Sequence, residues 1–151
     1  MSFKQVKMFS KSCEYAIKAV ICISQRSRED RRVSVKEVAK SIDAPEHFIG
    51  KILQELSRKR IIKSIKGPNG GFFLEKADLK TSLADIVKAI DGDKIYDECV
   101  LGLKACSQKN PCPVHDEYKE IKKKLIAMIE KNTVENFNEM IDSGKFFLKM
   151  K

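Results

Sequence analysis

A segment that cannot form a regular helix or strand divides this chain of 151 residues. Residues 98–115 (ECVLGLKACSQKNPCPVH) contain three of the five cysteines and one of the two histidines. Gly102, Pro111 and Pro113 interrupt any regular element there, so the segment is expected to be a loop that carries soft metal ligands. The chain is therefore expected to place one domain before this loop and a separate helical element after it.

The excess of positive charge lies before this loop. The formal net charge is +9; residues 1–72 contain 16 Lys and Arg against 7 Asp and Glu, whereas residues 73–151 contain 14 of each. A basic domain beside a neutral one is typical of proteins that bind nucleic-acid phosphates. Lysine-rich faces are also ordinary solvated surfaces, so charge alone leaves both interpretations open.

Bulk features argue against several classes of protein. No apolar run approaches the ~18 residues of a membrane span, and the N-terminal residues lack the apolar core of a secretory signal. We therefore expect a cytoplasmic protein without a membrane partner, in which cysteines serve as free thiols, metal ligands or redox groups rather than structural disulfides. The sequence shows no catalytic carboxylate pair, nucleophile–base motif or cofactor fingerprint, so we predict no enzyme activity.

Residues 11–26 are predicted to form the first helix, because apolar side chains recur on one face. That face consists of Tyr15, Ala16, Ala19, Val20 and Ile23. Cys13 and Glu14, at the start of the helix, are placed on the outward side.

A second helix is predicted to begin at Ser34, which has capping-box spacing to Glu37. Residues 43–45 (Asp-Ala-Pro) predict a turn, and Pro45 suits the first position of a third helix over residues 45–59. The inward face of the third helix is expected to contain Phe48, Ile49, Ile52, Leu53 and Leu56. Two helices joined by a short turn, the second polar and basic on its free face, are typical of a helix-turn-helix.

A β-hairpin is predicted directly after these helices. Residues 61–66 alternate like a strand, residues 67–71 (Gly-Pro-Asn-Gly-Gly) predict a turn, and residues 72–74 return. Such a unit inserts its second helix in the major groove, while the hairpin wing reaches the backbone or the minor groove. The residues expected to contact DNA are Pro45, Glu46, His47, Gly50, Lys51, Gln54 and Arg58 of the helix and Lys66 and Asn69 of the hairpin. Gly50 is equally compatible with a helix–helix contact.

Further helices flank the cysteine loop. Ser82 and Asp85 predict the start of one that ends at Gly92. A long helix over residues 114–131 follows the loop, and Thr133 is predicted to cap a short last helix. The apolar stripe of the long helix consists of Tyr118, Ile121, Leu125, Met128 and Ile129. This stripe needs a partner, either the domain itself or the same helix of a second subunit.

Five pieces of the sequence, taken together and in order, are more specific than any one of them. They are residues 9–19 (FSKSCEYAIKA), 48–56 (FIGKILQEL), 63–74 (KSIKGPNGGFFL), 83–92 (LADIVKAIDG) and 112–115 (CPVH). Together they resemble the Rrf-type (IscR/NsrR) family of bacterial winged-helix transcription regulators. The hairpin piece is the most specific, and the resemblance covers most of the chain.

The resemblance implies a homodimer on a palindromic operator in double-stranded DNA. It also implies a regulator, a repressor in preference to an activator, that senses redox state, nitric oxide or iron–sulfur status. In the iron–sulfur members three loop cysteines hold a cluster, here Cys99, Cys106 and Cys112, with 2Fe–2S favoured over 4Fe–4S. The fourth ligand is then either His115 or Glu14 of the partner subunit.

Other chemistries stay open for the loop. Three cysteines and one histidine suit a tetrahedral zinc site, although such sites prefer ligand pairs about two to four residues apart, which this loop lacks. A thiol switch between Cys106 and Cys112 and a cluster-free regulator are further alternatives. The sequence departs from the family in the long gap between Cys99 and Cys106 and in Lys66, where arginine is common.

The predicted fold is mainly α with a small β-hairpin wing: a winged helix-turn-helix followed by a long C-terminal dimerisation helix. We expect residues 1–92 to be the DNA-binding domain and residues 93–115 to be the sensor loop. Residues 116–151 are expected to be the dimerisation helix and C-terminal tail.

Overall fold

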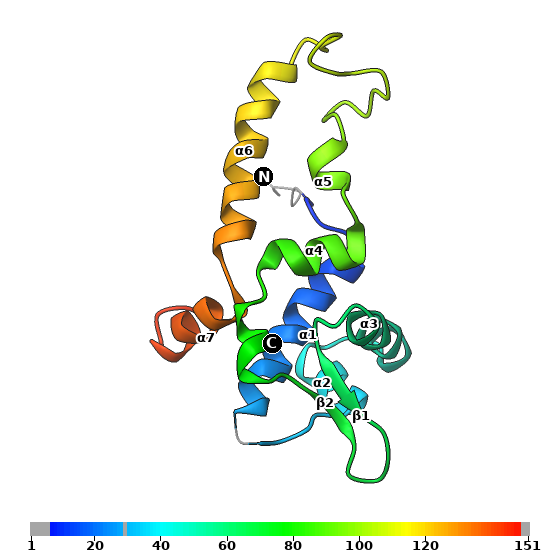
Figure 1. Ribbon diagram of the computed structural model, residues 1–151, viewed down its shortest axis with the longest axis vertical. Helices are drawn as coiled ribbons and strands as arrows, with labels where there is room; N and C mark the ends of the chain where they lie inside the picture. Colours follow the sequence, from blue (N-terminus) through cyan, green and yellow to red (C-terminus); the bar gives the residue numbers. More distant parts are fainter. Residues whose placement is uncertain (1–6, 29, 149–151) are drawn as a thin grey trace, which may run out of the picture.

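Helices dominate the computed structural model, which describes residues 7–28 and 30–148. The elements are α1 (Lys11–Ser27), α2 (Val35–Ser41), α3 (Glu46–Arg58), β1 (Lys63–Ile65), β2 (Gly71–Phe73), the 3-10 turn η1 (Lys76–Lys80), α4 (Leu83–Asp91), α5 (Lys94–Asp97), α6 (His115–Lys131) and α7 (Val134–Asp142) (Figure 1). The mainly α fold with a hairpin wing is thus confirmed. Residues 1–6, 29 and 149–151 of the predicted domain ranges lie outside the described part.

Helix α1 lies at the centre of the fold. It packs against α2, α3, α4, α7 and β2. Its predicted inner face is fully buried at Ala16, Ala19, Val20 and Ile23, and these side chains share one apolar core with buried side chains of every helix from α2 to α7 except α5. Removal of this apolar surface from water holds the helices around α1.

Local hydrogen bonds set where the helices begin. The Glu37 amide donates to the Ser34 Oγ at 3.2 Å, and the Ser34 amide donates to the Glu37 carboxylate at 2.8 Å. Ser82 and Asp85 make the same reciprocal pair at 3.1 and 2.9 Å. Both predicted capping boxes are therefore formed, and Thr133 caps α7 as expected.

A third backbone segment pairs with the wing, and the sequence did not reveal it. β1 and β2 pair antiparallel, with Ser64 opposite Phe72. On the other side of β2, Val33 and Phe72 exchange backbone hydrogen bonds of 2.9 and 2.8 Å. The segment directly before α2 is thus paired to the wing, and Gly71 lies at this junction with φ of +148°.

Three local expectations were wrong. Phe48 is 36% exposed rather than inward, and its ring meets Tyr15 edge-on with centroids 5.8 Å apart. Cys13 is fully buried rather than outward. Pro45 occupies the N-cap position of α3, one residue before its first helical position. Helix α5 and the turn η1 were not predicted, because each is only a few residues long.

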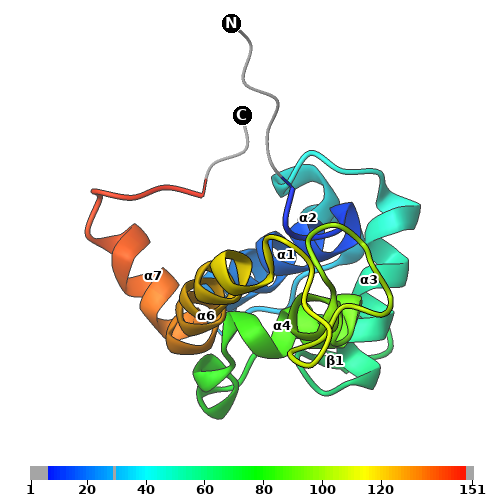
Figure 2. The same cartoon turned by 90° about the horizontal axis from the view of Figure 1, so that it is seen from above.

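Helix α6 stands out from the body and carries the cysteine loop at its far end. Figure 1 shows this loop and the β1–β2 wing at opposite ends of the long axis, and Figure 2 shows α6 almost end-on with α7 on its outer side. Leu125 and Ile129 bury the stripe of α6 against the domain, whereas Ile121 and Met128 remain 57% and 43% exposed. None of the helices in the described residues is long and apolar enough to span a membrane.

We expect the Gly71→Ala variant to be less stable than Gly67→Ala. Both glycines have positive φ, so each alanine pays backbone strain of about 1–3 kcal/mol. A Cβ on Gly71 would also lie 2.9 Å from the Val33 carbonyl oxygen, whereas one on Gly67 would meet nothing within 4 Å. Thermal unfolding followed by circular dichroism measures the difference. Equal melting temperatures would contradict the close packing of the segment at Val33 on the wing.

Candidate functional site

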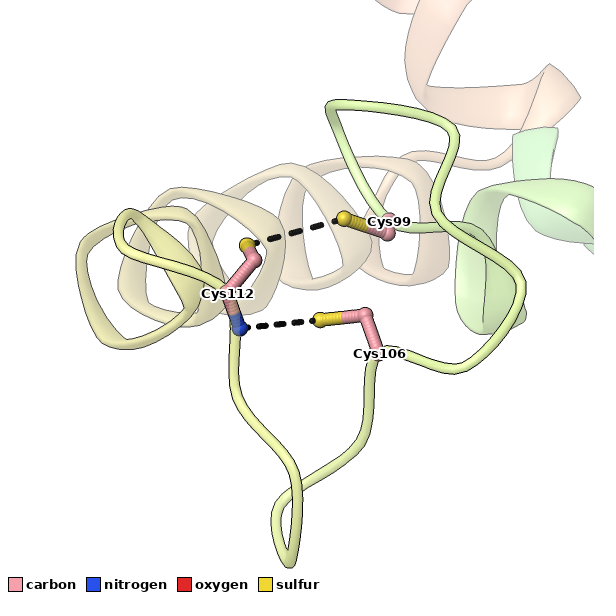
Figure 3. Close-up of side chains that lie close together, drawn as sticks. All are labelled: Cys99, Cys106 and Cys112. Carbon is pink, nitrogen blue, oxygen red and sulfur yellow. Dashed lines mark hydrogen bonds between the residues drawn. The ribbon is translucent and has the colours of Figure 1, made fainter.

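The cysteine loop brings its three sulfur atoms together. The Sγ atoms of Cys99, Cys106 and Cys112 all lie within 4.8 Å of one another, and those of Cys99 and Cys112 are 3.7 Å apart (Figure 3). The Cys112 amide donates to the Cys106 Sγ at 3.4 Å. All three are free thiols of intermediate exposure. The predicted soft-ligand set is therefore assembled within a single chain.

The two candidates for a fourth ligand lie in different places. His115, the first residue of α6, has its Nδ1 3.2 Å from the Cys106 Sγ. Glu14, in the first turn of α1, forms an ion pair of 3.6 Å with Lys11 and does not belong to the sulfur group of its own chain. Within one chain, the geometry thus brings His115 and not Glu14 to the thiols.

The donor set suits a soft or borderline metal. Thiolate and imidazole ligands bind both zinc and iron–sulfur clusters. Two sulfur ligands on one tetrahedral zinc lie about 3.8 Å apart, since each Zn–S bond is about 2.3 Å, and the 3.7 Å between Cys99 and Cys112 matches this spacing. A two-iron cluster spreads its ligands over two metal ions, so it requires one of the three sulfurs to move outward.

The surroundings of the thiols push their pKa values apart. Hydrogen bonds from the backbone amides of Leu103 and Leu101 lower the pKa of Cys99 to about 7. For Cys106 the hydrogen bond from the Cys112 amide lowers the pKa, but burial and the neighbouring thiols outweigh it and the net pKa is raised. Cys99 is therefore the thiol best prepared to become a thiolate near neutral pH.

A hollow of about 360 Å³ adjoins the three sulfurs. It is lined by the three cysteines and by Tyr96, Tyr118 and Lys122, among others. The Lys122 Nζ donates to the carbonyl oxygens of Tyr96 and Glu98 at 3.2 and 3.1 Å. No local pattern predicts this contact, because Lys122 is one of three consecutive lysines on the polar face of a helix.

The residues expected to contact DNA lie on α3 and on the wing. Pro45, Glu46, His47, Lys51, Gln54, Arg58, Lys66 and Asn69 are exposed. Arg58 forms an ion pair with Glu55 of the same helix. Gly50 is half-buried, and a Cβ there would lie 3.7 Å from Val35 of α2. This ordinary contact distance leaves room for alanine, so close helix packing does not by itself require glycine at this position.

Arg32 is a second residue that the sequence did not single out. Its Nη1 donates to the Asn69 carbonyl oxygen at 3.0 Å, and its guanidinium lies 5.8 Å from the centre of the Phe73 ring. Through these contacts, Arg32, in the loop before α2, stabilises the turn of the wing. No local signal marks Arg32, because its partners lie about 40 residues away in sequence.

Comparison with known proteins identifies the family. Residues 9–139 match the Rrf2 family, which is described as an iron-dependent transcriptional regulator. The chain belongs to the Rrf2 family. It is also 33% identical over 131 residues to a protein of Aquifex aeolicus (strain VF5) that carries the name of an HTH-type transcriptional regulator, covering 85% of this chain and 90% of that one. These relatives are regulators of transcription and not enzymes.

More distant Rrf2-type proteins are also similar to this chain. The HTH-type transcriptional regulator NsrR of Geobacillus kaustophilus is 27% identical over 86 residues, covering 57% of this chain and 58% of that one. The structure of IscR from T. potens superimposes with a TM-score of 0.72 at 17% identity, covering 96% of this chain and 93% of that one. CymR, the global cysteine regulator of B. subtilis, gives 0.71 at 18% identity, with 89% and 98% covered. These structures share the fold.

Alkylation of the reduced, metal-free protein tests the thiol environments. We expect the rate at Cys99 to rise between about pH 6 and pH 8 and then to level off, because its pKa is about 7 and the thiolate is the reactive form. Burial, helped by the charge of Asp91, raises the pKa of Cys13 to about 12, so Cys13 should stay unmodified until the protein unfolds. Mass spectrometry after iodoacetamide treatment measures both. A Cys99 rate still rising above about pH 9 would contradict the lowered pKa.

Proposed function

We propose that this Rrf2-family protein is a DNA-binding transcription regulator whose affinity for its operator is set by a metal centre on Cys99, Cys106 and Cys112. The observation that carries the proposal is the convergence of three sulfurs from a proline-broken loop within 4.8 Å of one another. The iron-dependence in the description of the family supports iron as the metal. The three cysteines are therefore assigned as ligands.

The proposed metal is an iron–sulfur cluster, 2Fe–2S in preference to 4Fe–4S. When bound, such a cluster supplies redox chemistry and reactivity toward oxidants or nitric oxide. His115 is the fourth ligand within the chain, because its Nδ1 already contacts the Cys106 sulfur. Glu14 of the partner subunit is the alternative, since Glu14 lies on an outer turn of α1 and away from the thiols of its own chain.

We propose a homodimer on a palindromic operator. The unburied half of the α6 stripe, Ile121 and Met128, supports a second α6 as the covering surface. Two copies of α3 would then enter major grooves about 34 Å apart or a multiple of it. Lys51 and Arg58 contact phosphates in this arrangement, Glu46, His47 and Gln54 face base edges, and Lys66 and Asn69 bring the wing to the backbone.

We propose that three regions have different roles: residues 1–92 bind DNA, residues 93–115 sense the redox, nitric oxide or iron–sulfur signal, and residues 116–151 pair the subunits. The sensor loop joins α5 to the first residue of α6. Ordering of residues 99–115 therefore acts on the end of the helix that pairs the subunits. A shift of α6 changes the spacing of the two α3 helices and thus the affinity for the operator. We assign the protein as a repressor by analogy with the family.

A structural zinc ion is the second candidate for the same site. It is favoured by the 3.7 Å spacing of the Cys99 and Cys112 sulfurs, which fits one tetrahedral ion without movement. In that case the loop is a fixed structural element and the regulator responds to another signal.

Metal analysis of protein purified without oxygen separates these candidates. We expect about two iron and two sulfide per chain and a brown colour, as is typical of a 2Fe–2S protein. Cys106→Ala should lose most of both, because it removes one ligand, whereas Cys22→Ala, in a half-buried thiol on α1, should retain them. About one zinc per chain and no colour would favour the structural ion. A protein that contains neither iron nor zinc would reject the metal centre, but this result would leave the DNA-binding proposal unaffected.

Operator titration tests the sensor and DNA functions separately. We expect a difference in affinity between metal-loaded and metal-free protein, and equal affinities would exclude sensing. Lys51→Ala should weaken binding about equally on all duplexes and reduce the salt dependence by about one phosphate contact. Lys124→Ala, an exposed lysine on α6, is the matched control and should bind as the wild type does. Absence of any salt-dependent duplex binding would overturn the proposed function.

A further inference from the structure

We propose that Lys122 is a positioning residue that closes the base of the cysteine loop. Its ammonium group holds the backbone that leads into Cys99 against α6, the helix that follows Cys112. The proposal rests on the proposed function in treating this loop as the metal centre. The contact itself is a property of the metal-free chain and is testable there.

The two ends of the loop lie on the α5–Glu98 segment and on α6. Its second end runs directly into α6 at His115. Its first end follows α5 and Glu98, and the Lys122 Nζ donates to the carbonyl oxygens of Tyr96 and Glu98 at 3.2 and 3.1 Å. Among the described residues these are the two hydrogen bonds between the α5–Glu98 segment and α6. Lys122 thus joins the start of the loop to the helix that carries its end.

The chemistry of a helix end explains why a cation binds there. Helix α5 has only four residues, so its last carbonyl groups have no partner within the helix. Lysine side chains satisfy such carbonyls and interact favourably with the negative end of the helix dipole. The Lys122 Nζ also lies 5.2 Å from the centre of the Tyr118 ring, one turn earlier on α6, which favours the same position.

The position of Lys122 matters because Cys99 is the next residue after Glu98. Cys99 must stay near Cys112 for the three sulfurs to remain within 4.8 Å. The Glu98 amide donates to the Lys94 carbonyl oxygen of α5 at 2.9 Å, but Glu98 is extended and exposed, and in the described residues only the Lys122 hydrogen bonds join this backbone to α6. Lys122 also lines the hollow beside the sulfurs.

Lys123 provides a matched comparison on the same helix. It is the neighbouring residue, it carries the same charge, and its Nζ pairs at 3.1 Å with Glu120 within α6. Its side chain is 63% exposed and, among the described residues, forms no hydrogen bond or ion pair with α5 or the loop. Replacing it changes the net charge as Lys122→Met does but leaves the loop base closed.

Hydrogen exchange and alkylation of the reduced, metal-free full chain test the proposal. We expect Lys122→Met to raise both amide exchange over residues 97–103 and the alkylation rate of Cys99 about fivefold, which corresponds to losing hydrogen bonds worth about 1 kcal/mol. Lys122→Arg should restore both, because a guanidinium also donates to two carbonyls. Lys123→Met should match the wild type, and exchange in α1 should be unchanged in every variant.

The outcomes separate this proposal from the metal centre. Unchanged exchange and alkylation in Lys122→Met, or equal changes in Lys123→Met, would overturn the positioning role. If the wild type binds neither iron nor zinc, the metal centre fails while the exchange data still decide the role of Lys122. If it binds metal, we expect Lys122→Met to lose it to a chelator faster than Lys123→Met, and Lys122→Arg to lose it at the wild-type rate.

Discussion

Burial of one face of α1 is the constraint on which the rest of this structure depends. The helix is covered by α2, α3, α4 and α7, and both of its ends are tied to functional parts of the molecule. At its start, the Ser10 amide donates to the Asp91 carboxylate at 3.0 Å, where α4 ends and the path to the cysteine loop begins. At its end, the Ser27 hydroxyl accepts from the Leu74 amide at 3.1 Å, directly after the wing. Helix α1 therefore links the end of α4, which leads toward the cysteine loop, with the segment that follows the wing.

Different kinds of interaction stabilise the two ends of the molecule. The DNA-binding end is assembled by apolar packing of α3 on α1, which leaves an outward face of exposed polar and charged side chains. The cysteine-loop end has little apolar packing of its own: Val100, Leu101 and Leu103 are each at least half exposed. Hydrogen bonds within the loop, sulfur contacts and the Lys122 hydrogen bonds hold it instead. A segment held by polar contacts with little apolar burial is expected to open at a low cost in free energy, which fits the sensing role proposed for it.

The sequence and the structure agree where the forces are local. Capping boxes at Ser34 and Ser82 depend on residues three positions apart, so they can be read from the chain, and both are formed. The hairpin turn and the apolar periods of α1, α3 and α4 are of the same kind. Phe48 shows where this fails, because its placement was decided by Tyr15 of another helix. Cys13 shows the same, since burial beside α4 overrode its expected outward position.

The sequence alone determined the family, the fold class and the three cysteines as a candidate ligand set, because residue types and short spacings carry that information. Only the tertiary structure decided that the Cys99 and Cys112 sulfurs come within 3.7 Å of each other and that His115 contacts Cys106. It also placed Arg32 at the wing and Lys122 at the base of the loop. These contacts join residues 9 to 37 positions apart in sequence. Their geometry is set by how the helices pack, and no local pattern encodes it.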